Sequence, residues 1–171
     1  MKIELKNIRT HQGRQGYGLN ADILVDGKKV VHVLDSGNGG CFDYTLCGQS
    51  TDAYLANGKV LKQLEEYAKT IMINETFEHL DALVNKLVLE TEYERTNLKF
   101  IAKKQKSAIL VGNPANLKSG KFECGIFSYG KVQLSLFPKQ QLQGMVDKAK
   151  LKLKPKQVIL NTNLKELGII F

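Results

Sequence analysis

The segment from Asn20 to Tyr44 reads NADILVDGKKVVHVLDSGNGGCFDY. Two apolar runs rich in β-branched residues, 21–25 and 30–34, flank Asp26-Gly27, and an Asp-Gly pair between such runs is the strongest short-range signal for a hairpin. The second run continues into residues 35–40, where three glycines in four positions permit positive φ angles and close approach of the backbone to a neighbour. The segment therefore predicts a β-hairpin followed by a glycine turn, the name used below for residues 35–40.

The chain around this segment predicts a further strand and two amphipathic helices. Residues 2–8 alternate roughly as a strand does, and residues 11–18 form a glycine-spaced loop that lacks the Lys-Ser/Thr of a phosphate loop. Residues 45–57 show little periodicity. Apolar residues recur every three or four positions over 59–72 and again over 76–92, which indicates one buried face on each of two helices. The short link between the two predicts a helical hairpin.

The C-terminal part predicts a second set of strands and one helix. Residues 107–112 (SAILVG) are a short apolar run typical of a buried strand. Residues 121–128 and 132–137 bracket a turn and predict a second hairpin. Pro138 stands at a favourable first-turn position for a helix to about residue 152, and residues 158–160 predict a last core strand.

Together these elements predict one α+β domain over residues 1–171, with an N-terminal antiparallel β-hairpin sheet, a helical hairpin and a β-hairpin/helix/strand unit. Three sub-lobes are expected: β-rich (1–58), helical (59–105) and basic α/β (106–171). No window approaches the roughly 18 apolar residues of a membrane span, and the alternating N-terminus differs from a signal peptide. We therefore expect a cytoplasmic protein, in a bacterial host cell, that does not bind membranes.

The charge of the chain is unevenly distributed. The net charge is +8, but residues 1–98 carry 11 Lys+Arg against 14 Asp+Glu, a net of −3, whereas residues 99–171 carry 14 Lys against 3 acids, a net of +11. All the C-terminal cations are lysines, which suit salt-sensitive contacts to a phosphate backbone better than readout of bases. The lysines predicted to bind a polyanion are Lys103, Lys104, Lys106, Lys121, Lys148, Lys150, Lys152, Lys154 and Lys156. Equally, they can serve only as a solvated surface.

Three cysteines, Cys41, Cys47 and Cys124, are an odd number in a chain without an export signal, so we expect free thiols. Neither Cys41 nor Cys47 belongs to a Cys-x-x-Cys pair, and only three histidines could complete a zinc site. We therefore predict no metal and no cofactor.

The glycine turn and the residues after it are the candidate ligand site of the sequence. Successive backbone N–H groups in such a turn can cradle a phosphate or nucleotide. The predicted ligand-binding residues are Asp35, Gly37, Asn38, Gly39, Gly40, Cys41, Asp43 and Tyr44. The competing interpretation is a purely structural turn, with Tyr44 packed on the sheet; Asp35 and Asp43 place negative charge beside the proposed anion and favour it.

The run strand-VDGKK-strand-DSGNGGCFDY, followed by helices and a late VILN segment, resembles a family of small uncharacterised proteins from bacteriophages and mobile elements. In that family the turn usually reads like NDGHGG with a nearby acid and tyrosine. The resemblance covers residues 20–44, and Asn38 stands where many relatives have histidine, which weakens an assignment of that position as proton carrier or metal ligand. The resemblance implies a phage or mobile-element context and no mechanism.

The sequence therefore predicts a non-enzymatic accessory protein that binds a polyanion, either nucleic acid or a nucleotide, through its lysine-rich C-terminal half. Aromatic residues among the lysines support this prediction, because bases stack on aromatic rings beside cations. They are Phe100, Phe122, Phe127 and Tyr129. Two alternatives remain: a protein that binds and inhibits a host defence or replication factor, and a small hydrolase or nuclease that uses Asp35, Cys41 or Asp43.

Overall fold

The computed structural model describes residues 1–170 and has the α+β architecture that the sequence predicts. The chain divides into two compact units, of which the first ends at Leu89 and the second begins at Glu90. This division falls within helix α2 (His79–Lys104). The expected sub-lobe boundaries do not coincide with this division. Residue 58 is inside helix α1 (Thr51–Ile71), and residue 105 directly follows α2.

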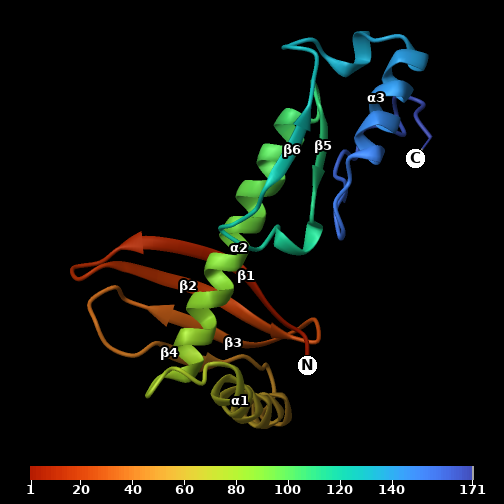
Figure 1. Ribbon diagram of the computed structural model, residues 1–171. Helices are drawn as coiled ribbons and strands as arrows, with labels where there is room; N and C mark the ends of the chain where they lie inside the picture. The colour runs from red at the N-terminus through yellow and green to blue at the C-terminus, as the bar shows by residue number, and fades with distance from the viewer. Residues whose placement is uncertain (171) are drawn as a thin grey trace. The chain divides into compact units, whose positions relative to one another are not determined.

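The first unit is built on a four-stranded antiparallel sheet whose strands follow one another in chain order (Figure 1). They are β1 (Ile3–Gln12), β2 (Tyr17–Val25), β3 (Lys28–Asp35) and β4 (Asp43–Leu46). The predicted hairpin between β2 and β3 is confirmed: Asp26 and Gly27 have φ angles of 49° and 82°, the left-handed conformation that a tight two-residue turn requires. β4 lies beyond the predicted strands and places Tyr44 opposite Val33.

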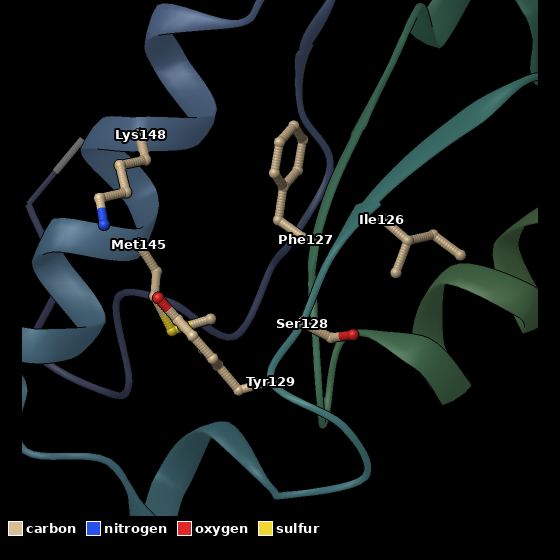
Figure 2. A pocket seen from close by; sticks show the side chains of 6 residues that line it. All are labelled: Ile126, Phe127, Ser128, Tyr129, Met145 and Lys148. Carbon is tan, nitrogen blue, oxygen red and sulfur yellow. The ribbon is translucent and has the colours of Figure 1, made fainter.

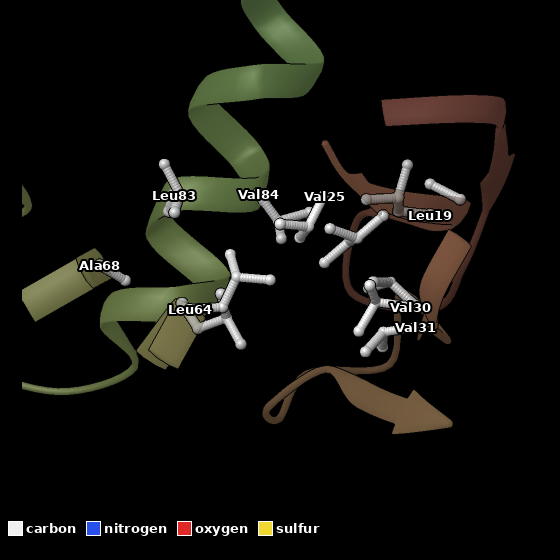
Figure 3. Packing of buried hydrophobic residues seen from close by; sticks show 12 residues of the cluster. Leu19, Val25, Val30, Val31, Leu64, Ala68, Leu83 and Val84 are labelled. Carbon is white, nitrogen blue, oxygen red and sulfur yellow. The ribbon is translucent and has the colours of Figure 1, made fainter. Parts of the chain in front are cut away.

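The two helices that pack on this sheet differ from the predicted ranges, α1 mainly at its start and α2 mainly at its end. α1 begins at Thr51, before the predicted start at residue 59, because Ser50 Oγ accepts the Ala53 N–H at 3.3 Å and caps the helix there. α2 begins at His79 and continues without interruption to Lys104. Side chains of both helices form one apolar core with the sheet (Figure 3). Its members include Leu64, Ala68, Leu83, Val84, Leu19, Val25, Val30 and Val31.

A polar cluster lies on the opposite face of this sheet, because Asp22 alternates along β2 with two core residues, Ala21 and Ile23. The Asp22 carboxylate lies 2.8 Å from both Lys29 Nζ and His32 Nδ1, and it accepts a hydrogen bond of 2.7 Å from the side chain of Asn7. Burial opposes the ionised form of Asp22, yet hydrogen bonds from these three side chains outweigh it and lower its pKa from 3.8 to about 2.

Asn7 reaches this carboxylate from an irregular point in β1. The register between β1 and β2 shifts between Lys6 and Arg9, and Asn7 has a φ of 53°. A bulge of this kind re-aims one side chain out of the regular alternation. The cluster therefore joins three strands through one buried carboxylate.

The second unit contains a three-stranded antiparallel sheet in which β5 (Ile109–Gly112) lies between β6 (Cys124–Phe127) and β7 (Val158–Ile159). All four residues of β5 are buried. Ile109 and Val111 belong to the core formed with helix α3 (Lys139–Leu151), whereas Leu110 packs with Ile101 near the end of α2. Helices thus cover both faces of the central strand.

The predicted second hairpin is wrong in its second strand. Residues 132–137 contain a 3₁₀ turn (Leu134–Leu136), and β6 pairs with β5 instead. Alternation in this run does not mark a sheet face, because Leu134 is fully buried while Leu136 is 74% exposed. The Leu134 N–H donates to the Lys106 carbonyl at 2.8 Å, and Pro138 directly afterwards has no N–H for a strand ladder. A second 3₁₀ turn (Pro114–Asn116) follows β5.

Asn161 fixes the position of β5 beyond the two-residue strand β7. Its side-chain oxygen accepts the Leu110 N–H at 2.7 Å, and its Nδ2 donates to the Ala108 carbonyl at 2.9 Å. This buried side chain thus supplies two hydrogen bonds of the kind that a longer β7 would have made to this part of the chain.

Replacing Asp22 with Asn is expected to lower the free energy of unfolding by about 2 kcal/mol near neutral pH, because Lys29 and His32 lose a buried negative partner. In the natural chain this contribution is complete above about pH 4, and it is lost as the pH falls toward 2, since the folded pKa lies below the unfolded one. Urea unfolding followed by circular dichroism at several pH values measures both effects. Asp43→Asn is the control, because Asp43 is an exposed carboxylate of the same sheet. Equal loss in the two variants would contradict the prediction.

Candidate functional site

The glycine turn packs against the loop that joins β1 to β2. The Gln15 N–H donates to the Gly37 carbonyl at 2.9 Å, and the Arg14 N–H donates to Asn38 Oδ1 at 3.1 Å. A Cβ on Gly37 would lie 2.7 Å from the backbone nitrogen of Gly18, and a Cβ on Gly13 would lie 2.3 Å from the Gly37 carbonyl oxygen. Glycine is therefore needed at this contact to bring two backbones together.

Two of the backbone donors of the turn have partners within it. The Gly37 N–H donates to the Asp35 carboxylate at 2.8 Å, and the Asn38 N–H lies 3.4 Å from Ser36 Oγ. Gly37, Gly39 and Gly40 have φ angles of 67°, 79° and 114°. The N–H groups of Gly37 and Asn38 are thus directed to side chains of the turn itself, which favours the structural interpretation over a phosphate cradle.

The residues after the turn meet the start of α2. The Cys41 thiol donates to a Glu78 carboxylate oxygen at 2.8 Å. Asp81 accepts the Phe42 N–H at 2.9 Å and the Tyr44 hydroxyl at 2.5 Å. Burial, and then the hydrogen bond to Asp81, raise the pKa of the Tyr44 hydroxyl. Tyr44 therefore serves as a neutral donor that ties β4 to α2.

Cys41 Sγ and the carboxylates of Glu78 and Asp81 have donor atoms within 4.8 Å of one another. The hydrogen bond to Glu78 and its charge raise the pKa of the Cys41 thiol. A thiol that donates to a carboxylate is protonated, whereas a nucleophile or a metal ligand must be a thiolate. The arrangement thus works as a hydrogen-bonded clamp between the turn and α2.

A second set of predicted residues meets in the second unit, at a pocket between β6 and α3. The cavity measures about 260 Å³. Figure 2 shows the Tyr129 side chain directed toward Met145 of α3, with Phe127 on the β6 side and Lys148 on α3. Ile126 and Ser128 complete its lining. We call these six residues the aromatic–lysine pocket.

Further contacts hold the rings of this pocket. Lys152 Nζ lies 5.6 Å from the centroid of the Phe127 ring, within the range of a cation–π interaction. The ring of Tyr129 tilts at 46° to that of Phe137, with centroids 6.0 Å apart. Tyr129 is nevertheless 52% exposed. An aromatic surface with two adjacent ammonium groups is therefore open to solvent.

The remaining predicted lysines are exposed but lie in other places. Lys150 is about 200° around α3 from Lys148 and lies 3.9 Å from Asp147. Lys103 and Lys104 are in the last turn of α2, where their positive charges interact favourably with the helix dipole. Lys106 lies in the segment between α2 and β5, Lys121 precedes β6, and Lys154 and Lys156 lie between α3 and β7. The structure thus brings Lys148 and Lys152 to the pocket.

Another cavity, of about 340 Å³, lies along α1 in the first unit. Its lining combines apolar side chains with two lysines: Leu46, Tyr54, Leu55, Gly58, Lys59 and Lys62. Gly58 leaves space beside Leu46, whose Cδ1 would lie 3.5 Å from an added Cβ. No sequence pattern predicts this groove, since it combines the weakly periodic start of α1 with β4.

Comparison with protein-family models, with curated proteins and with solved structures found no match to this chain. Of the helices within residues 1–170, none has the length and apolar character needed to cross a membrane. The arguments about function therefore rest on the chemistry of the sites themselves.

Three residues of these sites are not predicted from the sequence. Met145 belongs to an ordinary apolar helix stripe, and Glu78 and Asp81 belong to a typical acidic helix start.

Replacing Gly37 with Ala is expected to lower the free energy of unfolding by about 2 to 4 kcal/mol, because a Cβ disfavours the left-handed conformation of this position and would meet the backbone of Gly18. Gly16→Ala, in the facing loop, is the control: nothing lies within 4 Å of its added Cβ. Thermal unfolding of the two variants measures the difference. A Gly37→Ala protein of natural stability would show that the glycine serves something other than this backbone contact.

Replacing Glu78 with Gln is expected to speed alkylation of Cys41 near neutral pH, because the carboxylate that raises the thiol pKa is removed. Brief treatment with iodoacetamide, followed by mass spectrometry of each cysteine peptide, measures the rate. Cys47 and Cys124 act as internal references within the same sample. An unchanged Cys41 rate would mean that Glu78 does not control the thiol.

Proposed function

We propose that this chain binds a polyanion, nucleic acid or a nucleotide, at the aromatic–lysine pocket of its second unit and has no catalytic role there. The observation that carries the proposal is that Lys148 lines one pocket with Phe127 and Tyr129, while Lys152 Nζ lies 5.6 Å from the centroid of the Phe127 ring. Ammonium groups neutralise phosphates, while aromatic faces stack on bases. A ligand that combines both chemistries fits this surface best.

The surroundings of the pocket support the same ligand class. Residues 99–171 carry a net charge of +11, which raises the local concentration of polyanions before contact. The cations are all lysines, so the expected contacts are to phosphates and depend strongly on salt. The glycine turn is not included in this site, because it belongs to the first unit and the aromatic–lysine pocket belongs to the second.

A phage or mobile-element origin is also proposed, supported by the resemblance of residues 20–44. The same resemblance does not point to any particular activity. An accessory role in the cytoplasm of a bacterial host agrees with the proposed binding function. The groove along α1 is the feature that favours the alternative of protein binding, since it presents apolar side chains beside Lys59 and Lys62.

The double variant Lys148→Gln/Lys152→Gln is expected to bind a fluorescein-labelled oligonucleotide about tenfold more weakly than the natural chain at low salt. Affinity falls as salt rises, and the steepness of this decrease, the slope of log affinity against log salt, should be smaller by about 2 because two phosphate contacts are lost. Fluorescence anisotropy across a salt series measures both quantities.

The matched control is Lys139→Gln/Lys150→Gln. It removes the same charge from the opposite side of α3, where Lys150 lies near Asp147 and Lys139 lies beside Gly168. Equal weakening in both double variants would indicate a diffuse charge effect and contradict the pocket. Absence of binding by the natural chain to any nucleic acid or nucleotide at low salt would refute the proposed function altogether.

A further inference from the structure

The size of the aromatic–lysine pocket limits what can enter it. Its volume of about 260 Å³ is below the range of about 300 to 1,000 Å³ that encloses a complete drug-sized ligand. The apolar lining of Phe127, Tyr129 and Met145 suits a flat aromatic group, while the ammonium of Lys148 stands at the lining as well. One base therefore fits inside, and its sugar and phosphates remain outside.

A base can enter such a pocket only if it is unstacked and unpaired. In a duplex the base faces are covered by their neighbours, and extruding one base costs a few kcal/mol. A duplex would therefore meet this surface through its phosphates alone and make no use of Tyr129, which is 52% exposed. A single strand presents its bases freely and can stack one of them on the ring.

The position of Lys148 and Lys152 at the C-terminal end of α3 disfavours a compact polyphosphate as the ligand and favours an extended nucleic-acid strand. Lys148 lies in the last turn of α3, and Lys152 caps its C-terminus, where the helix dipole carries partial negative charge. A triphosphate concentrates its charge at one point, and helix N-termini, not C-termini, bind such groups. Four residues along a helix span about 6 Å between Cα atoms, a spacing at which two long side chains can each reach a separate phosphate of an extended strand.

We infer that the ligand of the aromatic–lysine pocket is single-stranded nucleic acid, with one base held against Tyr129 and Phe127 and the neighbouring phosphates on Lys148 and Lys152. This inference rests on the proposed polyanion-binding function and narrows it to one ligand class. The strand is bound without regard to base sequence, because stacking uses the π-face that every base has.

The test compares three probes with the full chain at low salt: an oligothymidylate about ten nucleotides long, a duplex hairpin with a similar number of phosphates, and ATP. The oligothymidylate is expected to bind at least about tenfold more tightly than the other two. Tyr129→Ala should weaken its binding by about tenfold, whereas Tyr129→Phe keeps the stacking ring and the affinity. The chain contains no tryptophan and six tyrosines, so the part of the tyrosine fluorescence quenching that is lost in Tyr129→Phe reports stacking on this ring.

The matched control is Tyr54→Ala, which removes a tyrosine of similar exposure, 50%, from α1 in the first unit. It should bind the oligothymidylate as the natural chain does. If the duplex binds as tightly as the strand, and Tyr129→Ala has no effect, the inference fails while polyanion binding stands. If ATP binds more tightly than the strand, the pocket is a nucleotide site and the inference fails. If none of the probes binds, the proposed function fails with it.

Discussion

The side-chain amide of Asn161 holds the central strand of the second unit, and the pocket depends on where that strand lies. β7 has only two residues, so β5 would otherwise have a buried N–H at Leu110 and a buried carbonyl at Ala108 without strand partners. An unpaired buried backbone group costs about 1 to 3 kcal/mol. With β5 fixed, β6 pairs along one side of it and α3 packs on Ile109 and Val111, which places Phe127 opposite Lys148.

Local signals in the sequence predicted the fold where a single physical requirement decides the structure. Asp26-Gly27 allows the left-handed conformation of a tight turn, so the hairpin of the first unit was predicted correctly. The alternating run 132–137 misled because its alternating apolar residues do not share a buried face: Leu134 is buried within a 3₁₀ turn, whereas Leu136 is exposed. The start of α1 was missed because the Ser50 cap sets it, without an apolar stripe.

The candidate sites show the same division between local and long-range information. The glycine turn is conspicuous in the sequence, but its partners are Gly13, Gln15 and Gly18 in the facing loop, and only the folded chain brings these backbones together. Tyr129 and Lys148 were both noted in the sequence among aromatics and lysines. Their meeting depends on the packing of α3 against β6, which no local pattern encodes.

Lysines near the end of α3 have a structural role that does not depend on any ligand, since cations at a helix C-terminus stabilise the dipole. That role is satisfied by Lys150, which lies away from the pocket and near Asp147. It does not account for the aromatic surface beside Lys148 and Lys152. Exposure alone does not distinguish Tyr129, because Tyr54 is 50% exposed as well; Tyr129 differs in that it lines one pocket with Phe127 and Lys148 and packs at a tilt on Phe137. The combination of an open ring and two ammonium groups is therefore better explained by a ligand with both a base and phosphates than by helix stability.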